Sequence, residues 1–99
     1  MEIKNCDSIE DVRNEIDKVD DKIVDLLIER SKYVKQAAKF KKSIEEVKSD
    51  KRVKNVLDRT RMKAIESGIS PMMVEEVFKT LINEMVSYEI EEFQDRKAF

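Results

Sequence analysis

The stretch IEDVRNEIDKVDDKIVDLLIERSKYVKQAAKF, residues 9–40, decides the fold class of this 99-residue chain. Apolar side chains recur in it every three or four residues, a spacing that places them on one face of a helix. Ser8 with Asp11 three residues later is a helix-start signal. At ~1.5 Å per residue, the predicted helix is roughly 50 Å long. The apolar face, named the seam below, comprises Ile9, Val12, Ile16, Val19, Ile23, Leu26, Tyr33, Ala37 and Phe40.

Beyond this stretch the sequence predicts two more helices. Residues 41–50, KKSIEEVKSD, lose the apolar spacing and form the expected connection, which ends at Ser49 or Asp50 as the N-cap of a second helix. Gly68 is suited to ending that helix, and Ser70-Pro71 to starting the third. The apolar positions expected to face the core are Val53, Val56, Leu57, Thr60, Ala64 and Ile65 in the second helix and Val74, Val77, Phe78, Leu81, Ile82 and Met85 in the third.

The composition favours a second copy of the chain as a partner. Charged residues make up 42% of the sequence and hydrophobic residues 40%, so each helix carries only a narrow apolar stripe. A domain of this size is marginally stable alone, and two shorter helices cannot cover the whole seam. We therefore expect an all-α fold, with residues 1–99 as one domain whose three helices intertwine with those of a second copy in a homodimer.

Several classes of function are disfavoured. The net charge is −2 with both signs interspersed, unlike the basic face of a nucleic-acid-binding protein. No apolar run approaches the ~20 residues of a membrane span. The chain has no His, which excludes histidine acid–base chemistry and histidine metal sites, and we expect neither metal nor cofactor. A polar N-terminus and a single cysteine, Cys6, lead us to expect a cytoplasmic protein.

Charged residues interrupt the predicted apolar faces. Arg30 lies on the seam, and Lys41, eleven residues later, lies on nearly the same side of the helix. Arg13 is adjacent to the seam, Arg52 stands at the start of the second helix, and Glu89 occupies an apolar position of the third. Each of these charged residues can also be explained by a purely structural role, as part of a register-setting ion pair, as a solvated lysine or as part of a frayed helix end. Together, however, these charges would be costly to bury without a ligand, and a small dianion would offset that cost.

Spacing along the first helix adds a constraint. Arg13 and Arg30 are seventeen residues apart, roughly 25 Å on one helix, so one small ligand cannot contact both in the same chain. An antiparallel pair of long helices would bring Arg13 of one copy near Arg30 and Lys41 of the other. Such a dimer would contain two equivalent sites.

The sequence resembles the all-helical chorismate mutases. Residues 12–41 contain the pattern R-x-x-I-D-x-x-D-x-x-I-V-x-L-L-x-x-R, from Arg13 to Arg30, followed by Lys41 eleven residues later. The similarity continues through Lys51-Arg52-Val53 and through residues 74–93, and so covers nearly the whole chain. The run RSKYVKQAAKFK, residues 30–41, is similar to a branch that includes the isochorismate pyruvate lyases of salicylate synthesis.

The resemblance implies a role for each charged residue. Arg13 from the partner copy and Arg30 would bind the two carboxylates of the substrate, and Lys41 would bind a carboxylate and the ether oxygen. Arg52 would add positive charge. Glu89 matches the position of a Gln, or of a Glu in some members, that donates a hydrogen bond to the ether oxygen. Members often carry acidic groups near Arg52 for the substrate hydroxyl; the corresponding residues here are Ser49 and Val53, with Asp50 nearby.

The implied reaction is the pericyclic rearrangement of chorismate to prephenate, which needs no nucleophile, metal or cofactor. Fixed cations would hold the compact conformer, and Lys41 with Glu89 would stabilise charge on the breaking ether bond. Only a protonated Glu89 can donate a hydrogen bond, so activity is expected to decline as pH rises. Two alternatives remain open: isochorismate pyruvate lyase activity in the same site, and a non-catalytic helical dimerisation or regulatory module. Residues 42–50 are a candidate mobile lid.

Overall fold

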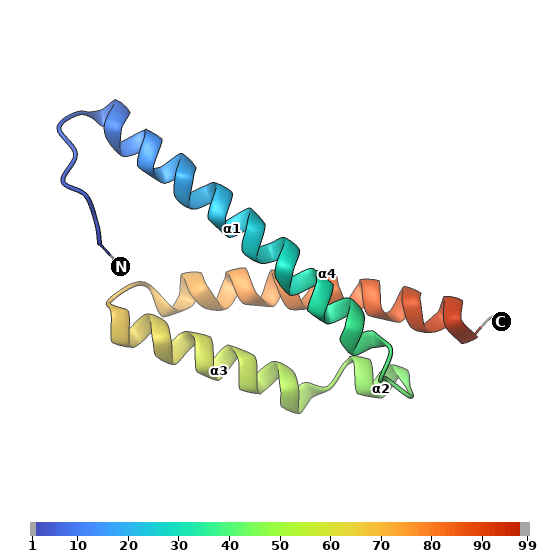
Figure 1. The fold of residues 1–99 in the computed structure, drawn as a ribbon. Helices are drawn as coiled ribbons and strands as arrows, with labels where there is room; N and C mark the ends of the chain where they lie inside the picture. Colours follow the sequence, from blue (N-terminus) through green and yellow to red (C-terminus); the bar gives the residue numbers. More distant parts are fainter. Residues whose placement is uncertain (1, 98–99) are drawn as a thin grey trace. The chain divides into compact units, whose positions relative to one another are not determined.

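The computed structural model describes residues 2–97 and contains helices but no strand within them. The helices are α1 (Ile9–Ala38), α2 (Ile44–Val47), α3 (Asp50–Ser67) and α4 (Pro71–Lys97) (Figure 1). The all-α prediction, with three long helices, is confirmed. Backbone proximity divides the chain into two compact units, Met1–Tyr33 and Val34–Phe99.

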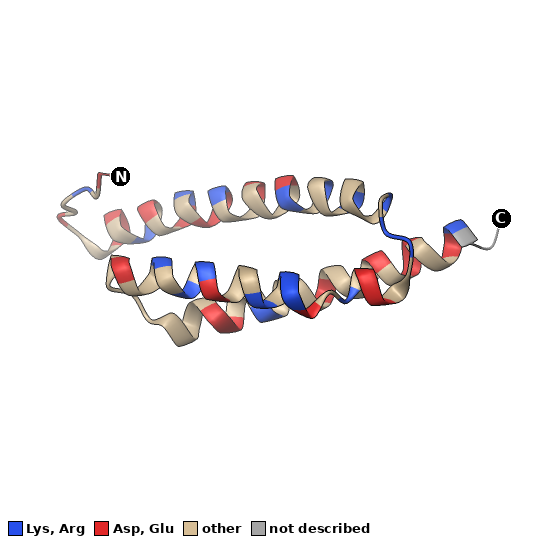
Figure 2. Ribbon diagram, turned by 90° about the horizontal axis from the view of Figure 1, so that it is seen from below, with Lys and Arg blue, Asp and Glu red and all other residues tan. Residues whose placement is uncertain are grey.

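The first unit consists of most of α1 and the extended segment before it. Ser8 Oγ accepts a hydrogen bond of 3.1 Å from the backbone N–H of Asp11, which confirms the predicted helix start. The 30 residues of α1 confirm the predicted length, although the helix ends at Ala38 rather than at Phe40. The Phe40 N–H bonds instead to the carbonyl of Ala37, three residues back, in a tighter final turn. Acidic and basic residues are interleaved along α1 (Figure 2).

The seam of α1 remains exposed to solvent in the single chain. Val12 is 38% exposed, Ile16 51% and Leu26 62%, although their spacing is that of a buried stripe. The extended segment before α1 covers part of this face and encloses with it an open hollow of about 1110 Å³. The apolar side chains that line the hollow are Ile3, Val12, Ile16 and Val19.

The second unit is built on α3 and α4, which run side by side in opposite directions (Figure 1). Its buried apolar side chains come from every helix that enters it and are Ala38, Val47, Val56, Ala64 and Ile82. Ile65 and Val77, whose spacing predicts that they face the core, are instead 55% and 52% exposed. Each lies at the edge of its helix's apolar stripe, so the packing of α3 on α4 leaves it outside.

The two ends of α3 and the start of α4 follow the sequence signals. Ser49 Oγ accepts a bond of 3.3 Å from the N–H of Arg52, and Ser70 Oγ accepts one of 3.2 Å from the N–H of Met73. Gly68 follows α3 with φ of +75°, a left-handed conformation that glycine adopts at little cost. Of the two predicted N-caps, Ser49 and Asp50, Ser49 is the one that caps α3, and the predicted helix end at Gly68 and start at Ser70-Pro71 are confirmed.

The connection between α1 and α3 contains a helix that the apolar spacing does not reveal. Ser43 caps α2 by accepting a bond of 3.2 Å from the N–H of Glu46, and the Glu46 carboxylate accepts one of 2.6 Å from the N–H of Lys42. Val47, at the end of this helix, is only 5% exposed. Residues 42–50 are thus partly helical and packed. The pattern Ser43-x-x-Glu46 is the signal that predicts this turn.

No helix within residues 2–97 combines the length and the apolar character needed to span a lipid bilayer.

Candidate functional site

The five predicted site residues are divided between the two units. Arg13 and Arg30 lie on α1 in the first unit. Lys41 follows α1, Arg52 lies in the first turn of α3 and Glu89 lies on α4, all in the second unit. Each group is described within its own unit.

Arg13 and Arg30 differ in exposure. Arg13 is exposed and Arg30 is half-buried. The ion pairs within the described part of the first unit join Glu15 to Lys4 and to Lys18 and involve neither arginine. Two guanidinium groups seventeen residues apart on one helix, roughly 25 Å along its axis, can bind one small molecule only if they come from different copies of the chain.

Lys41 is held in place mainly through its main chain. Its N–H donates to the carbonyl of Ala38 at 3.3 Å, and its carbonyl accepts a bond of 2.9 Å from Nη2 of Arg96, near the end of α4. The half-buried side chain reaches α2, where Nζ donates to the main-chain carbonyl of Glu46 at 3.3 Å. The ammonium thus contacts a neutral acceptor near the surface and stays available to an anion.

Glu89 is a buried charged residue on α4 and is only 8% exposed. Met85 and Phe93, one turn before and one turn after it, are half-buried, so Glu89 lies on the packed face of the helix as predicted. Arg96 is seven residues after Glu89, nearly two full turns, and lies on almost the same side of α4. The main chain at Lys41 is therefore attached to the side of α4 that carries Glu89, roughly 10 Å further along the helix axis.

Arg52 lies in the first turn of α3 and is exposed. A cation is disfavoured at a helix N-terminus, since the unpaired N–H groups there carry partial positive charge. Asp50, in the same turn, partly compensates that charge. An anion bound near Arg52 would be stabilised both by the guanidinium and by the helix end.

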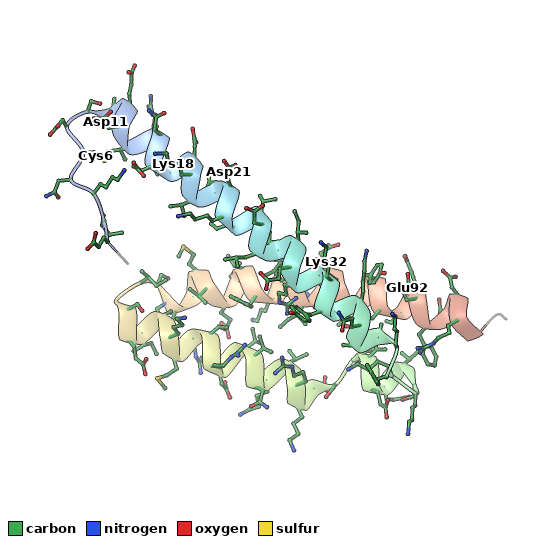
Figure 3. The ribbon with its side chains drawn as sticks, viewed as in Figure 1. Cys6, Asp11, Lys18, Asp21, Lys32 and Glu92 are labelled. Atoms are coloured by element: carbon green, nitrogen blue, oxygen red, sulfur yellow. The ribbon has the colours of Figure 1, made fainter. Side chains whose placement is uncertain are left out.

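A second polar cluster in the same unit was not predicted from the sequence. The phenolic O–H of Tyr88 donates to Oε1 of Glu92 at 2.9 Å, and Nζ of Lys35 lies 5.5 Å from the centre of the Tyr88 ring. Partial desolvation, followed by the contact with Glu92, raises the pKa of Tyr88. Figure 3 marks Glu92 in the second half of α4. These residues line a hollow of about 270 Å³ together with Ala38, Lys39 and Arg96.

This cluster joins α1 to α4, and only its spacing along α4 is visible in the sequence. Tyr88, Glu92 and Arg96 are four residues apart and so share one side of the helix. Among residues 2–97, no group of three or more Cys, Asp or Glu side chains is arranged to hold a metal ion.

Comparisons of the sequence with known proteins find similarity over most of the chain. The family model described as chorismate mutase type II matches residues 12–90. An isochorismate pyruvate lyase from Pseudomonas aeruginosa is 30% identical to this chain over 95 residues, which make up 96% of this chain and 94% of that protein. These matches confirm the family resemblance noted in the sequence and support an enzyme of this family.

Proposed function

The chain belongs to the chorismate mutase type II family, and we propose that it catalyses the rearrangement of chorismate to prephenate. The observation that carries this proposal is the attachment of Lys41 to the side of α4 that bears the buried Glu89. A cation and a carboxyl group on one packed framework suit a substrate that is anionic and develops charge on an ether oxygen. The family resemblance implies that these two positions act on that oxygen.

Binding of the substrate is assigned to the cations. Arg30 and the Arg13 of a second copy would each grip one carboxylate, since guanidinium forms two parallel hydrogen bonds with a carboxylate. Arg52 would add positive potential from the start of α3. Holding both carboxylates selects the compact conformer in which the two reacting carbon atoms meet, and this removes much of the entropic barrier.

The chemical step is assigned to Lys41 and Glu89. As the ether bond breaks, negative charge builds on its oxygen, and a fixed ammonium stabilises that charge more in the transition state than in the ground state. A protonated Glu89 would donate a second hydrogen bond to the same oxygen. No nucleophile or cofactor takes part in this pericyclic step.

The proposed working form is a homodimer. The seam of α1 is exposed in the single chain at Ile9, Ile16, Val19, Ile23 and Leu26, and the same helix from a second copy would bury it. Burial at about 25 cal/mol per Å² makes this stripe the main source of association energy. An antiparallel arrangement would also supply Arg13 to the partner's site.

Isochorismate pyruvate lyase activity is the second candidate. It is favoured by the similarity to the Pseudomonas aeruginosa lyase, which extends over 96% of this chain. That reaction also breaks the ether bond of a compact dianion, with a ring hydrogen passing to the departing enolpyruvyl group. The place of the enzyme would then be salicylate synthesis rather than aromatic amino acid synthesis. In either pathway, a protein with one cysteine suits the reducing cytoplasm.

The proposal is tested by incubating the purified protein with chorismate and, separately, with isochorismate, and by identifying the products by absorbance and chromatography. Prephenate from chorismate at the higher kcat/KM supports the mutase, whereas salicylate and pyruvate from isochorismate at the higher kcat/KM support the lyase. Lys41→Ala is expected to lose about 10²-fold or more in kcat/KM. Lys42→Ala is the matched control, because Lys42 is the exposed neighbour and contributes only its main chain to the hydrogen bond with Glu46.

If the protein turns over neither substrate, the proposal is contradicted. The remaining hypothesis is then a helical dimerisation or regulatory module without catalytic activity.

A further inference from the structure

The contact between Arg96 and Lys41 joins two residues fifty-five positions apart. We propose that Arg96 is a positioning residue, which fixes the Lys41 backbone so that its ammonium meets the substrate. This inference rests on the proposed function, in which Lys41 binds the substrate. Arg96 itself acts through Lys41 and is not assigned any contact with the reacting atoms.

The geometry concerns one peptide group, the one that links Lys41 to Lys42. Its carbonyl accepts a bond of 2.9 Å from Arg96 Nη2, and its N–H donates a bond of 2.6 Å to the Glu46 carboxylate. The two polar groups of this peptide are therefore bonded to side chains from two different helices, α4 and α2. Fixing the plane of a peptide restricts ψ of the residue before it, and so helps to set the direction in which the Lys41 side chain leaves the backbone.

Lys41 needs such a restraint because it lies outside regular helix. It follows the last turn of α1 and precedes the Ser43 cap of α2, and its N–H has only the long bond of 3.3 Å to Ala38. A lysine side chain has four rotatable bonds, and orienting it costs conformational entropy. A backbone that is already held reduces what the substrate must order upon binding.

Arg96 is well suited to this task. Its guanidinium lies 5.5 Å from the centre of the half-buried Phe93 ring, a contact that restrains the long side chain. The helix that carries it also carries Glu89, two turns earlier. One rigid element thus connects the proposed hydrogen-bond donor to the backbone that carries the proposed cation, so the separation of these two groups is set through α4.

A purely structural role would be stabilisation of the end of α4 by the contact with Phe93. The two roles are separated by a double-mutant cycle, because a residue that acts through Lys41 has little left to do once the Lys41 ammonium is removed. Four proteins complete the cycle: the unchanged chain, Arg96→Ala, Lys41→Ala and the double variant. Arg96→Lys tests rescue by a shorter cation. Arg59→Ala, which removes an exposed arginine from α3, controls for the loss of one charge.

If Arg96 positions Lys41, Arg96→Ala lowers kcat/KM about tenfold, roughly the effect of one hydrogen bond to a charged group. Arg96→Lys recovers part of the loss, and Arg59→Ala retains full activity. In the Lys41→Ala background the same Arg96→Ala change costs less than about twofold. An equal loss in both backgrounds, with a lowered Tm, would overturn the positioning role.

Hydrogen exchange of residues 39–43 in the absence of substrate tests the restraint itself. Arg96→Ala is expected to speed exchange in this segment about tenfold while leaving α3 unchanged. Unchanged exchange at 39–43 would overturn the inference even in an active enzyme. If Arg96→Ala speeds exchange at residues 39–43 but the unchanged protein turns over neither substrate, the restraint on the Lys41 backbone is supported. Only the proposed function is then contradicted.

Discussion

Lys4 Nζ lies 3.3 Å from Oε1 of Glu15, so the extended segment before α1 is bonded to the second turn of that helix. Lys18, on the next turn, lies 3.4 Å from the same oxygen atom. The Glu15 carboxylate thus forms ion pairs with two lysines, of which Lys18 lies on α1 and Lys4 lies in the segment before it. Figure 3 shows Cys6 in the same segment, beside the start of α1.

The hydrogen bond from Lys4, the largest cause, and the charge of Lys18 lower the pKa of Glu15, while partial desolvation opposes them. A lowered folded-state pKa means that this contact contributes stability above the ordinary pKa of Glu and loses it as pH falls through the lower, folded-state value. Lys4→Ala should therefore raise the pKa of Glu15 toward its ordinary value in an NMR titration. Lys32→Ala, on a distant turn of α1, is the control, and an unchanged Glu15 pKa in Lys4→Ala would contradict the contact.

Gly68→Ala is expected to destabilise the protein by about 1 kcal/mol, because an L-residue is strained in the left-handed region. The reason is the backbone alone: φ is +75° and a Cβ at this position would meet no atom within 4 Å. Urea denaturation measures the change. Ser67→Ala, at the exposed last residue of α3, provides the comparison. Equal stability of the two variants would show that the turn does not require glycine.

If the proposed dimer forms through the seam, Ile16→Lys is expected to give a monomer, since it places a charge in the middle of the face that a second copy would cover. Sedimentation should then give about the mass of one chain, 11.7 kDa. Asn14→Lys adds the same charge on the opposite side of α1 and should leave the proposed dimer intact. Monomers from both variants, or dimers from both, would mean that the seam is not the interface.

Glu89→Gln is expected to flatten the decline of kcat/KM with rising pH. The acid donates a hydrogen bond only while protonated, and its protonated fraction falls as pH rises, whereas an amide N–H₂ donates at every pH. Glu91→Gln changes an exposed neighbour on α4 and should leave the pH profile unchanged. If kcat/KM of Glu89→Gln declines with rising pH as steeply as that of the unchanged enzyme, a group other than Glu89 controls the pH profile.

The sequence predicts structure best where the residues that determine a feature all lie within or next to one helix. The spacing of the seam predicts α1, Ser49 and Gly68 predict where α3 begins and ends, and Ser70 predicts where α4 begins, because caps and apolar stripes are local features. The four-residue helix α2 is too short for any periodicity to show. Only the Ser43-x-x-Glu46 pattern predicts this helix.

Contacts between residues that are far apart in the sequence cannot be predicted from caps and apolar spacing. The hydrogen bond from Arg96 to Lys41 and the contact of the Lys35 ammonium with the Tyr88 ring depend on how the connection through α2 brings the end of α1 against α4. Spacing along one helix cannot predict either. The place of Glu89 in the apolar stripe predicts its burial, whereas its proposed chemical role, like that of the four cations, rests on the family resemblance.

The proposal that two copies of the chain contribute to each site is tested most directly by combining two variants that are each expected to be inactive. Arg13→Ala and Lys41→Ala are co-expressed, and activity is compared with that of each variant alone. If Arg13 is donated across the interface, every mixed dimer contains one intact site, and a statistical mixture regains about a quarter of the normal activity. Arg30→Ala mixed with Lys41→Ala is the control and should regain none, since both residues would serve the site of their own chain. No recovery in the first mixture, or equal recovery in both, would contradict the shared site.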